Sequence, residues 1–204
     1  MSSIRIYVEG GGDRKDTKAK CRRGFAVFFK KIFPERKQPK ITACGGRTKA
    51  FRSFCIATRQ NPENINILLV DSEEPVSKRP WEHLKDKDNW DRPDEATDDS
   101  AHLMVQCMES WFLADKDVLA EYYGQGFSLN ALPQRMNIEE IPKSDIQQAL
   151  EQATKNSQKG TYHKTKHAFD ILASIDPSKL GDDQVSVHAK RLIDYLKGLT
   201  ANNV

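Results

Sequence analysis

The sequence predicts an α/β fold: a small parallel sheet of about four strands, flanked by helices and followed by an α-helical C-terminal extension. In the first half, short apolar segments alternate with helical patterns, which is typical of β-α-β units and a parallel sheet. After about residue 115, only amphipathic helical patterns remain. We therefore expect an α/β core at residues 1–115 and a helical extension packed on it at residues 116–204.

Glycine turns mark the first two β-α units. Residues 4–8 predict a buried strand that stops at a run of glycines, and apolar residues at helical spacing predict a helix over residues 14–33. Residues 40–44 predict a second strand that ends at two glycines, and a helix is expected from about 47 to 59. Both helices would then begin directly after a glycine turn.

The third strand is the strongest element of the sequence. Residues 65–70 are continuously apolar, as expected for a central parallel strand covered on both faces. Residues 74–100 are acidic, contain three prolines and lack periodicity, which predicts a long loop. A fourth strand is expected over residues 102–108, and a helix near Asp115.

Three more helices are expected in the C-terminal extension. Amphipathic patterns place them at about residues 145–155, 161–174 and 186–199. Ser144 and Gln147 have the spacing of a capping box for the first of these helices.

The formal net charge of +3 is a sum of unlike parts. Residues 1–60 hold 16 basic and 4 acidic residues, residues 61–125 hold 6 and 16, and residues 126–204 hold 10 and 9. This asymmetry suits a basic face for a polyanion beside an acidic, cation-binding site. It also suits two segments that simply neutralise each other in the fold.

Several classes of protein are disfavoured by the composition. No apolar run approaches the roughly 18 residues of a membrane helix, and the first residues lack the layout of a signal peptide, so we expect a cytoplasmic protein without a membrane partner. The four cysteines are widely spaced and form no C-x-x-C pair. This argues against a cysteine-based zinc site and for buried free thiols.

Acidic residues follow the strands at the places where a parallel α/β sheet positions its active site. Glu9 follows the first strand, and Asp71 and Glu73 follow the third. Single acids at such places often cap helices, but three crowded carboxylates repel one another unless a divalent cation neutralises them. Oxygen ligands suit Mg²⁺ or Mn²⁺, which would polarise a phosphodiester and generate the attacking hydroxide. Glu109, after the fourth strand, is either a further metal ligand or a residue that orients one.

Basic residues around these acids are candidates for contact with nucleic acid or phosphate. Arg47 begins the helix after the second glycine turn, where it could hold a phosphate bidentately or remain an ordinary exposed arginine. His163 and His167 lie i, i+4 on one helix and could meet at one ligand or line a solvated face. We assign nucleic-acid or phosphate contact to the lysines of segment 14–37 and, by name, to Arg14, Lys15, Arg22, Arg23, Arg47, Lys164 and His167.

These acids resemble the pattern of the Toprim fold, which is shared by topoisomerases, bacterial primases, certain ribonucleases and overcoming-lysogenization-defect nucleases. An acid follows the first strand and an acid-x-acid follows the third. A closer resemblance, over about residues 4–197, is to a bacterial Toprim-related family of unassigned function. The strings that carry it are IYVEGGGD, RRGF, ACGGR, LLVDSE, PWEHL, HLMVQCMESWFLAD, IEEIPK and YHKTKHAFDIL.

The resemblance implies a Mg²⁺-binding domain, often encoded beside an ATPase in mobile or phage-defence gene clusters. By position, Glu9 matches the Toprim glutamate, a general acid/base or metal ligand, and Asp71 and Glu73 match the metal-binding pair. Glu73 stands where an aspartate is usual. We therefore expect a Mg²⁺- or Mn²⁺-dependent nuclease that acts on DNA or RNA with an ATPase partner, and that could form a homo-oligomer. The alternatives are a catalytically silent regulatory subunit of an ATPase and, less favoured, a nucleotidyl transferase.

Overall fold

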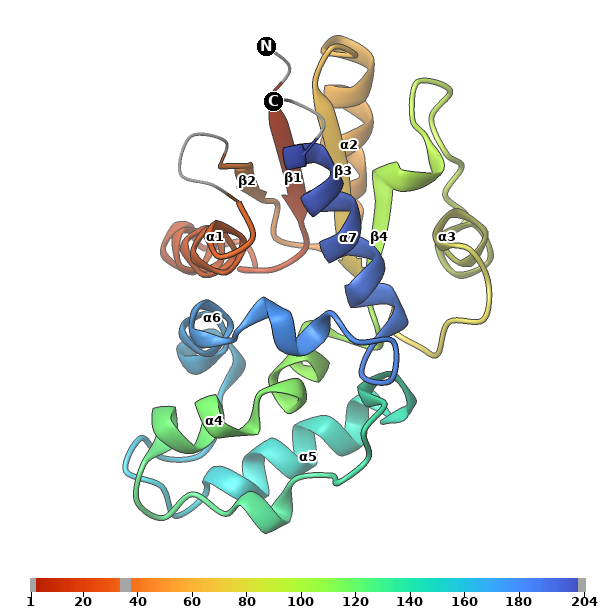
Figure 1. Cartoon of the computed structure of the whole chain (residues 1–204). Coiled ribbons are helices and arrows are strands. Elements are labelled where there is room, and N and C mark those ends of the chain that lie inside the picture. Colours follow the sequence, from red (N-terminus) through yellow and green to blue (C-terminus); the bar gives the residue numbers. More distant parts are fainter. Residues whose placement is uncertain (1–2, 34–37, 202–204) are drawn as a thin grey trace.

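The structure, a computed structural model, describes residues 3–33 and 38–201 and confirms the predicted α/β class (Figure 1). Within these residues, four parallel strands form a sheet in the order β2-β1-β3-β4. The strands are β1 (Ile4–Val8), β2 (Lys40–Ala43), β3 (Ile65–Asp71) and β4 (Ala101–Met104). Because β1 and β3 are neighbours at the centre of the sheet, the acids that follow them lie side by side at its carboxyl edge.

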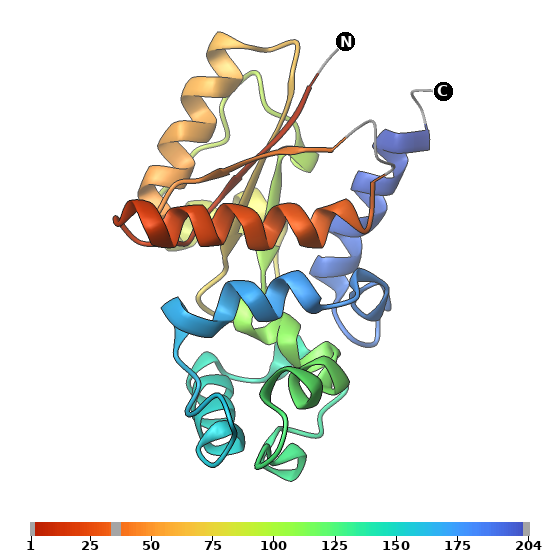
Figure 2. The ribbon, with the colours of Figure 1, turned by 90° about the vertical axis from the view of Figure 1, so that its left-hand side faces the viewer.

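The helices form a layer on each face of the sheet and a separate group beyond its carboxyl edge (Figures 1 and 2). One face is covered by α1 (Lys15–Lys30) and α7 (Val187–Ala201), and the other by α2 (Arg47–Gln60) and α3 (Pro80–Asp88). The remaining helices are α4 (Lys116–Tyr123), α5 (Lys143–Thr154) and α6 (Lys164–Ser174). Helix α6 packs along α1, so the C-terminal half closes over the edge where the acids lie.

The central strand β3 is buried on both faces, as its continuous apolar run predicts. Ile67 and Leu69 join the core under α1, whereas Leu68 and Val70 join the core under α2 and α3. Trp111 and Phe112, which follow β4, are also fully buried. In the part of the chain that the structure describes, no helix combines the length and apolarity needed to cross a membrane.

The prediction of a long loop over residues 74–100 is wrong, because α3 occupies part of it. Pro80 stands in the first turn, where its fixed φ favours a helix, and Trp81 and Leu84 bury one side. Such a short helix offers too few apolar residues for a helical period to stand out from the surrounding charges.

Two other predicted boundaries are corrected. Strand β4 ends at Met104, and residues Met108–Ala114 form a 3₁₀ helix, η3, rather than a continuation of the strand. Helix α5 begins at Lys143 after Pro142, so the predicted capping box does not form, and the Ser144 hydroxyl instead donates to the Asp145 carboxylate at 3.0 Å.

Candidate functional site

The three predicted acids meet at the carboxyl edge of the sheet. Glu9, Asp71 and Glu73 each offer a carboxylate oxygen, and these oxygens lie within 4.8 Å of one another. Val8 and Leu69 are partners in the β1–β3 register, and the Glu9 N–H donates to the Leu69 carbonyl at 3.2 Å, so the two chains emerge together. We call these three residues the acid cluster. Its oxygen donors suit a hard divalent cation, and their spacing is close to what one such ion spans.

Asp71 is the most deeply buried acid of the cluster, with 4% of its surface exposed. Burial raises the pKa of this carboxyl to about 7, the Lys164 charge opposes the shift, and the Glu9 and Glu109 charges add to it. Its Oδ1 accepts a hydrogen bond from the Met108 N–H at 2.8 Å, which fixes the carboxylate. Burial also raises the pKa of Glu9, and the Arg47 charge works against that rise. Both carboxylates therefore lack the charge compensation that a bound cation would supply.

Glu73 is held in an unusual backbone conformation. Its φ of 68° lies in the left-handed region, which costs a non-glycine residue free energy and needs support from its surroundings. Its N–H donates to the Gln106 carbonyl at 2.9 Å, and Lys143 Nζ donates to its carboxylate at 2.6 Å. The first turn of α5 therefore helps to place the third acid of the cluster.

A glycine-walled cavity opens beside the acid cluster. It measures about 230 Å³ and its wall includes Glu9, Asp71, Lys164 and the glycines at 10–12 and 45. Gly10 and Gly45 exchange two backbone hydrogen bonds of 2.8 and 3.0 Å, and a Cβ on Gly45 would lie 2.5 Å from the Gly12 carbonyl. Only glycine allows this close approach, which leaves room for a ligand next to the acids.

Arg47 reaches the site but is held by protein partners. Its guanidinium donates to both carboxylate oxygens of Asp88 at 2.9 and 2.6 Å and to the Asp71 carbonyl, and it lies 3.5 Å from Glu9. The group also lies over the Trp90 ring, 5.1 Å from its centroid. Arg47 is therefore a half-buried residue that positions Glu9 and Asp71, and not the exposed arginine that was one alternative.

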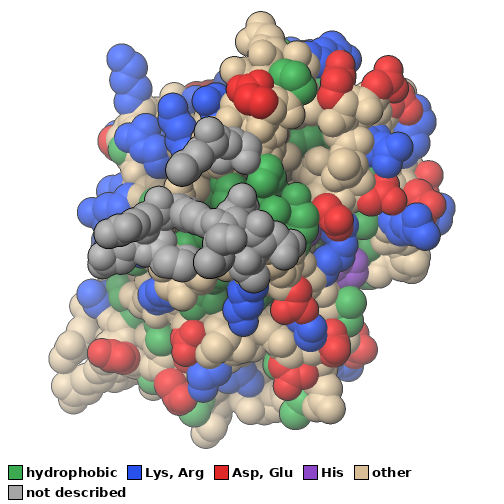
Figure 3. All heavy atoms as spheres, turned by 45° about the horizontal axis from the view of Figure 1, so that its top comes forward, with side chains coloured by type: hydrophobic (Ala, Val, Ile, Leu, Met, Phe, Trp, Pro, Cys, Tyr) green, Lys and Arg blue, Asp and Glu red, His purple; other side chains and the backbone are tan. Residues whose placement is uncertain are grey.

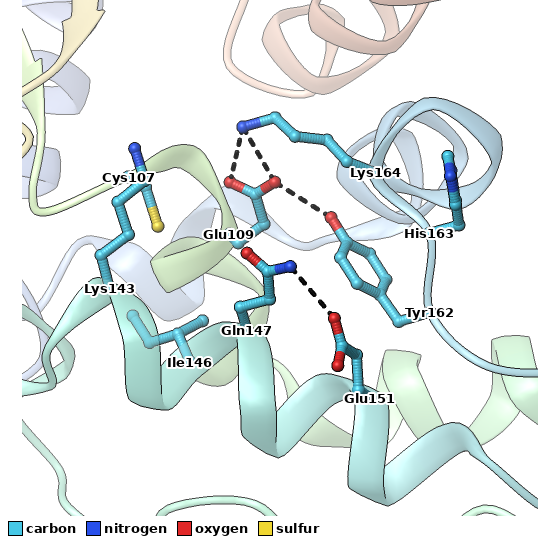
Figure 4. A pocket seen from close by; sticks show the side chains of 9 residues that line it. All are labelled: Cys107, Glu109, Lys143, Ile146, Gln147, Glu151, Tyr162, His163 and Lys164. Atoms are coloured by element: carbon cyan, nitrogen blue, oxygen red, sulfur yellow. Dashed lines mark hydrogen bonds and ion pairs between the residues drawn. The ribbon is translucent and has the colours of Figure 1, made fainter.

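Glu109 lies in η3, next to the acid cluster but outside its set of three. Lys164 Nζ lies 3.0 Å from Oε1 of Glu109 and donates to its Oε2 at 3.2 Å. The Tyr162 hydroxyl donates to Oε1 at 3.0 Å (Figure 4). Burial lowers the pKa of Lys164, but the Glu109 and Asp71 charges outweigh burial and hold it above the usual value. This arrangement fits an orienting role for Glu109, because Lys164 already pairs with its charge.

The predicted basic residues of α1 lie on one surface, which we call the α1–β2 surface. Lys15, Arg22 and Arg23 line an open hollow between α1 and β2 together with Lys18 and Lys40. Figure 3 shows Lys and Arg side chains gathered on this side of the molecule, whereas charges of both signs mix on the side of α3. Arg14 pairs with Asp16 instead, and residues 34–37 of the predicted basic segment lie outside the described residues.

The two histidines of the predicted pair do not converge on a surface ligand. His167 is buried against the rings of Tyr122, Tyr123 and Tyr162, and its Nδ1 accepts from the His163 backbone N–H at 3.1 Å. Burial lowers its pKa, and the nearby Lys166 charge adds to this effect. A buried neutral ring does not favour contact with a phosphate.

Three partners in this site were not found from the sequence: Lys143, Asp88 and Tyr162. Lys143 and Tyr162 lie in the C-terminal half, and Asp88 lies in the segment taken for a loop. Lys143 begins α5, Tyr162 precedes α6 and Asp88 ends α3, and in the sequence neither residue type nor spacing distinguishes them from ordinary residues at helix ends.

The chain belongs to a protein family described as a domain of unknown function (DUF4276), whose pattern matches residues 8–197. The matched region includes the acid cluster, the glycine turns, helices α1 to α6 and most of α7. No curated protein and no solved structure matches the chain.

Proposed function

We propose that this member of the DUF4276 family is a divalent-metal-dependent nuclease that hydrolyses DNA or RNA phosphodiesters. The observation that carries the proposal is the acid cluster, whose three carboxylate oxygens lie within 4.8 Å of one another at the carboxyl edge of a parallel sheet. The raised pKa values of Glu9 and Asp71 support it, because two buried carboxylates are undercompensated without a cation. The order of these acids along the chain supports a Toprim-like relationship, which we include in the proposal.

Each residue of the site has a distinct part in this proposal. Glu9, Asp71 and Glu73 would hold Mg²⁺ or Mn²⁺, which supplies a Lewis acid and an activated water. Arg47 and the Met108 N–H hold two of the carboxylates in place through the contacts already described. Lys164 presents a positive charge to the glycine-walled cavity, where the phosphate of a substrate would lie. Glu9 and Asp71 both have raised pKa values and line the glycine-walled cavity, and the resemblance to the Toprim glutamate makes Glu9 our candidate general acid or base.

The test is a panel of plasmid, linear duplex, single-stranded DNA and RNA substrates with Mg²⁺ or Mn²⁺. We expect divalent-dependent cleavage that falls at least about a hundredfold in Glu9→Gln and Asp71→Asn. Mutation of a residue that merely supports a metal ligand can cost about a hundredfold in activity, and loss of the ligand itself should cost no less. Asp86→Asn, an exposed acid on α3, is the matched control and should keep full activity. Cleavage that persists in EDTA, or in both site variants, contradicts the proposal.

The α1–β2 surface is our candidate for the nucleic-acid backbone. If it meets about six phosphates, log K should fall against log salt with a slope near −5 on duplex DNA. Lys15→Glu with Arg22→Glu should weaken binding without changing Mg²⁺ affinity. A flat salt dependence would assign this surface to a protein partner instead.

A second candidate function is a catalytically silent regulatory subunit of an ATPase complex. It is favoured by cations that occupy positions beside the acids: Arg47 lies beside Glu9, Lys143 bonds to Glu73, and Lys164 bonds to Glu109. Glu73 also departs from the aspartate expected there. A stable complex with the ATPase, together with no divalent-dependent cleavage of any substrate, would favour this function over the first. Under either function we expect a cytoplasmic protein, and a homo-oligomer remains compatible.

A further inference from the structure

A second cavity adjoins the acid cluster on the side of α5 (Figure 4). It measures about 240 Å³ and lies between α5, the residues that lead into α6, and η3. Lys164 lines both this cavity and the glycine-walled one, and Lys143 joins this cavity to the cluster through its bond to Glu73. We call it the α5 cavity, and the proposed metal chemistry uses neither Ile146, Gln147 nor Glu151 of its wall.

The α5 cavity combines apolar walls with a hydrogen-bonding edge. Cys107, Ile146 and the Tyr162 ring supply the apolar surface, and the hydroxyl bond to Glu109 holds that ring in place. Gln147 and Glu151 lie one turn apart on α5, with Gln147 Nε2 donating to the Glu151 carboxylate at 3.0 Å (Figure 4). An aromatic ring and a paired amide and carboxylate are the groups that recognise a flat heterocycle.

The size of the α5 cavity restricts the ligand. At about 30 Å³ per water molecule, its 240 Å³ holds about eight waters. This is below the roughly 300–1,000 Å³ of pockets that enclose drug-sized ligands. The cavity therefore fits one ring system, with the rest of the ligand outside it.

We propose that the α5 cavity binds a nucleobase that carries an exocyclic amino group. The carboxylate of Glu151 accepts hydrogen bonds only, so it pairs with the exocyclic amino groups of adenine, cytosine or guanine. In uracil and thymine the ring N–H lies between two carbonyl oxygens, which repel a carboxylate. The bond from Gln147 uses one of its two amide hydrogens and orients the carboxylate. The cavity would thus distinguish amino bases from the others.

The position of the two lysines links this cavity to the acid cluster. Lys143 and Lys164 both line the α5 cavity, and both pair with carboxylates at the site, Glu73 and Glu109. A nucleotide with its base in the cavity would direct its phosphate towards these two cations. The link to cleavage rests on the proposed nuclease function, whereas base binding itself does not.

The test is binding of uncharged nucleosides to the full chain in EDTA, measured by ligand-observed NMR or calorimetry. Adenosine, cytidine, guanosine and uridine are compared, and we expect at least one amino nucleoside to bind about tenfold or more tightly than uridine. Glu151→Gln should remove this preference, and Ile146→Trp, which fills the cavity, should abolish binding. Glu121→Gln on α4, an exposed glutamate, is the matched control.

The outcomes separate this inference from the nuclease proposal, because nucleoside binding requires neither metal nor cleavage. Equal binding of all four nucleosides, no binding of any, or a preference that survives in Glu151→Gln would overturn the base site. Circular dichroism of each variant shows that the fold is kept. If an amino nucleoside binds preferentially but no substrate is cleaved, only the nuclease proposal fails. If substrates are cleaved but all four nucleosides bind equally, only the base site fails.

Discussion

Two groups of acids in this chain, the acid cluster and the exposed acids of segment 74–100, differ in burial. In the acid cluster, burial raises the pKa of Glu9 and Asp71 above their usual values. In segment 74–100, exposed acids pair with neighbouring lysines, at 2.7 Å for Glu74–Lys87 and 2.5 Å for Asp86–Lys78. The lysine partners hold the pKa of Glu74 and of Asp86 below their usual values.

The difference shows that the count of charges does not identify a site, whereas desolvation does. A carboxylate in water costs little to keep ionised, and its ion pairs contribute little to stability. Burying an ionised carboxylate costs free energy, which only a specific partner or a bound cation offsets. The two groups should therefore respond to mutation with opposite signs or very different sizes.

Arg47 should produce the largest effect, because it joins the two groups through Asp88 and Glu9. Arg47→Met keeps the aliphatic stem and removes the charge, which leaves partly buried carboxylates unpaired. We expect the free energy of unfolding in EDTA to fall by about 3–5 kcal/mol in urea denaturation. Arg92→Met removes an arginine from an exposed pair with Asp98 and should cost less than about 1 kcal/mol. Equal losses in the two variants would mean that the charges at the site are not effectively buried.

Asp71→Asn should stabilise the metal-free protein while it removes a proposed metal ligand. Because the folded pKa of Asp71 is about 7 and the unfolded value is about 3.9, ionised Asp71 destabilises the fold. Below about pH 4, Asp71 is protonated in both states and does not destabilise the fold. As the pH rises towards 7, the wild type loses free energy of unfolding, and above pH 7 this loss stays constant. At about 1.36 kcal/mol per pKa unit, the gain in the variant approaches 4 kcal/mol at pH 8.

The pH dependence of that gain is the decisive measurement for Asp71. Urea denaturation in EDTA at several values between pH 5 and 8 should show the difference between variant and wild type growing with pH. Asp86→Asn, whose carboxyl has the opposite shift, is the matched control. A variant that is less stable than the wild type at every pH would contradict a buried, undercompensated Asp71.

The sequence was enough to predict the sheet and the acid cluster, and the reasons are local. Continuous apolar residues mark β3, glycine turns end β1 and β2, and parallel strands bring their carboxyl ends to one edge. The partners of the acids were not predictable in this way. Lys143 reaches Glu73 from 70 residues along the chain, and no periodicity reports such a contact.

Exposure was the other property that the sequence did not reveal. Arg47 and His167 follow patterns that are common on exposed helix faces, yet one is held by Asp88 and the other lies among tyrosine rings. Whether a polar side chain is buried depends on which helices pack over it, and here those helices come from distant segments. Packing therefore decides which of the predicted basic residues are free to meet a ligand.

Metal binding should depend on pH through the same buried carboxyl. A proton on Asp71 competes with the cation, so Mn²⁺ affinity should fall about tenfold between pH 8 and pH 6 if its pKa is about 7. The raised pKa of Glu9 adds to this dependence. Calorimetry at four pH values measures it, with Asp86→Asn as a control that should follow the wild type. A constant affinity over this range would mean that Asp71 is not a ligand.

The smallest effect is expected in the exposed group. A double-mutant cycle of Lys78→Met and Asp86→Asn should give a coupling of about 0.2–1 kcal/mol, because both side chains are more than half exposed, at 56% and 58%. The coupling should shrink further in 1 M salt, where the Debye length is about 3 Å. A coupling of several kcal/mol, or one that salt leaves unchanged, would mean that this part of segment 74–100 is shielded from water. The contrast between exposed and buried acids would then no longer explain why the pKa values of Glu9 and Asp71 are raised while those of Glu74 and Asp86 are lowered.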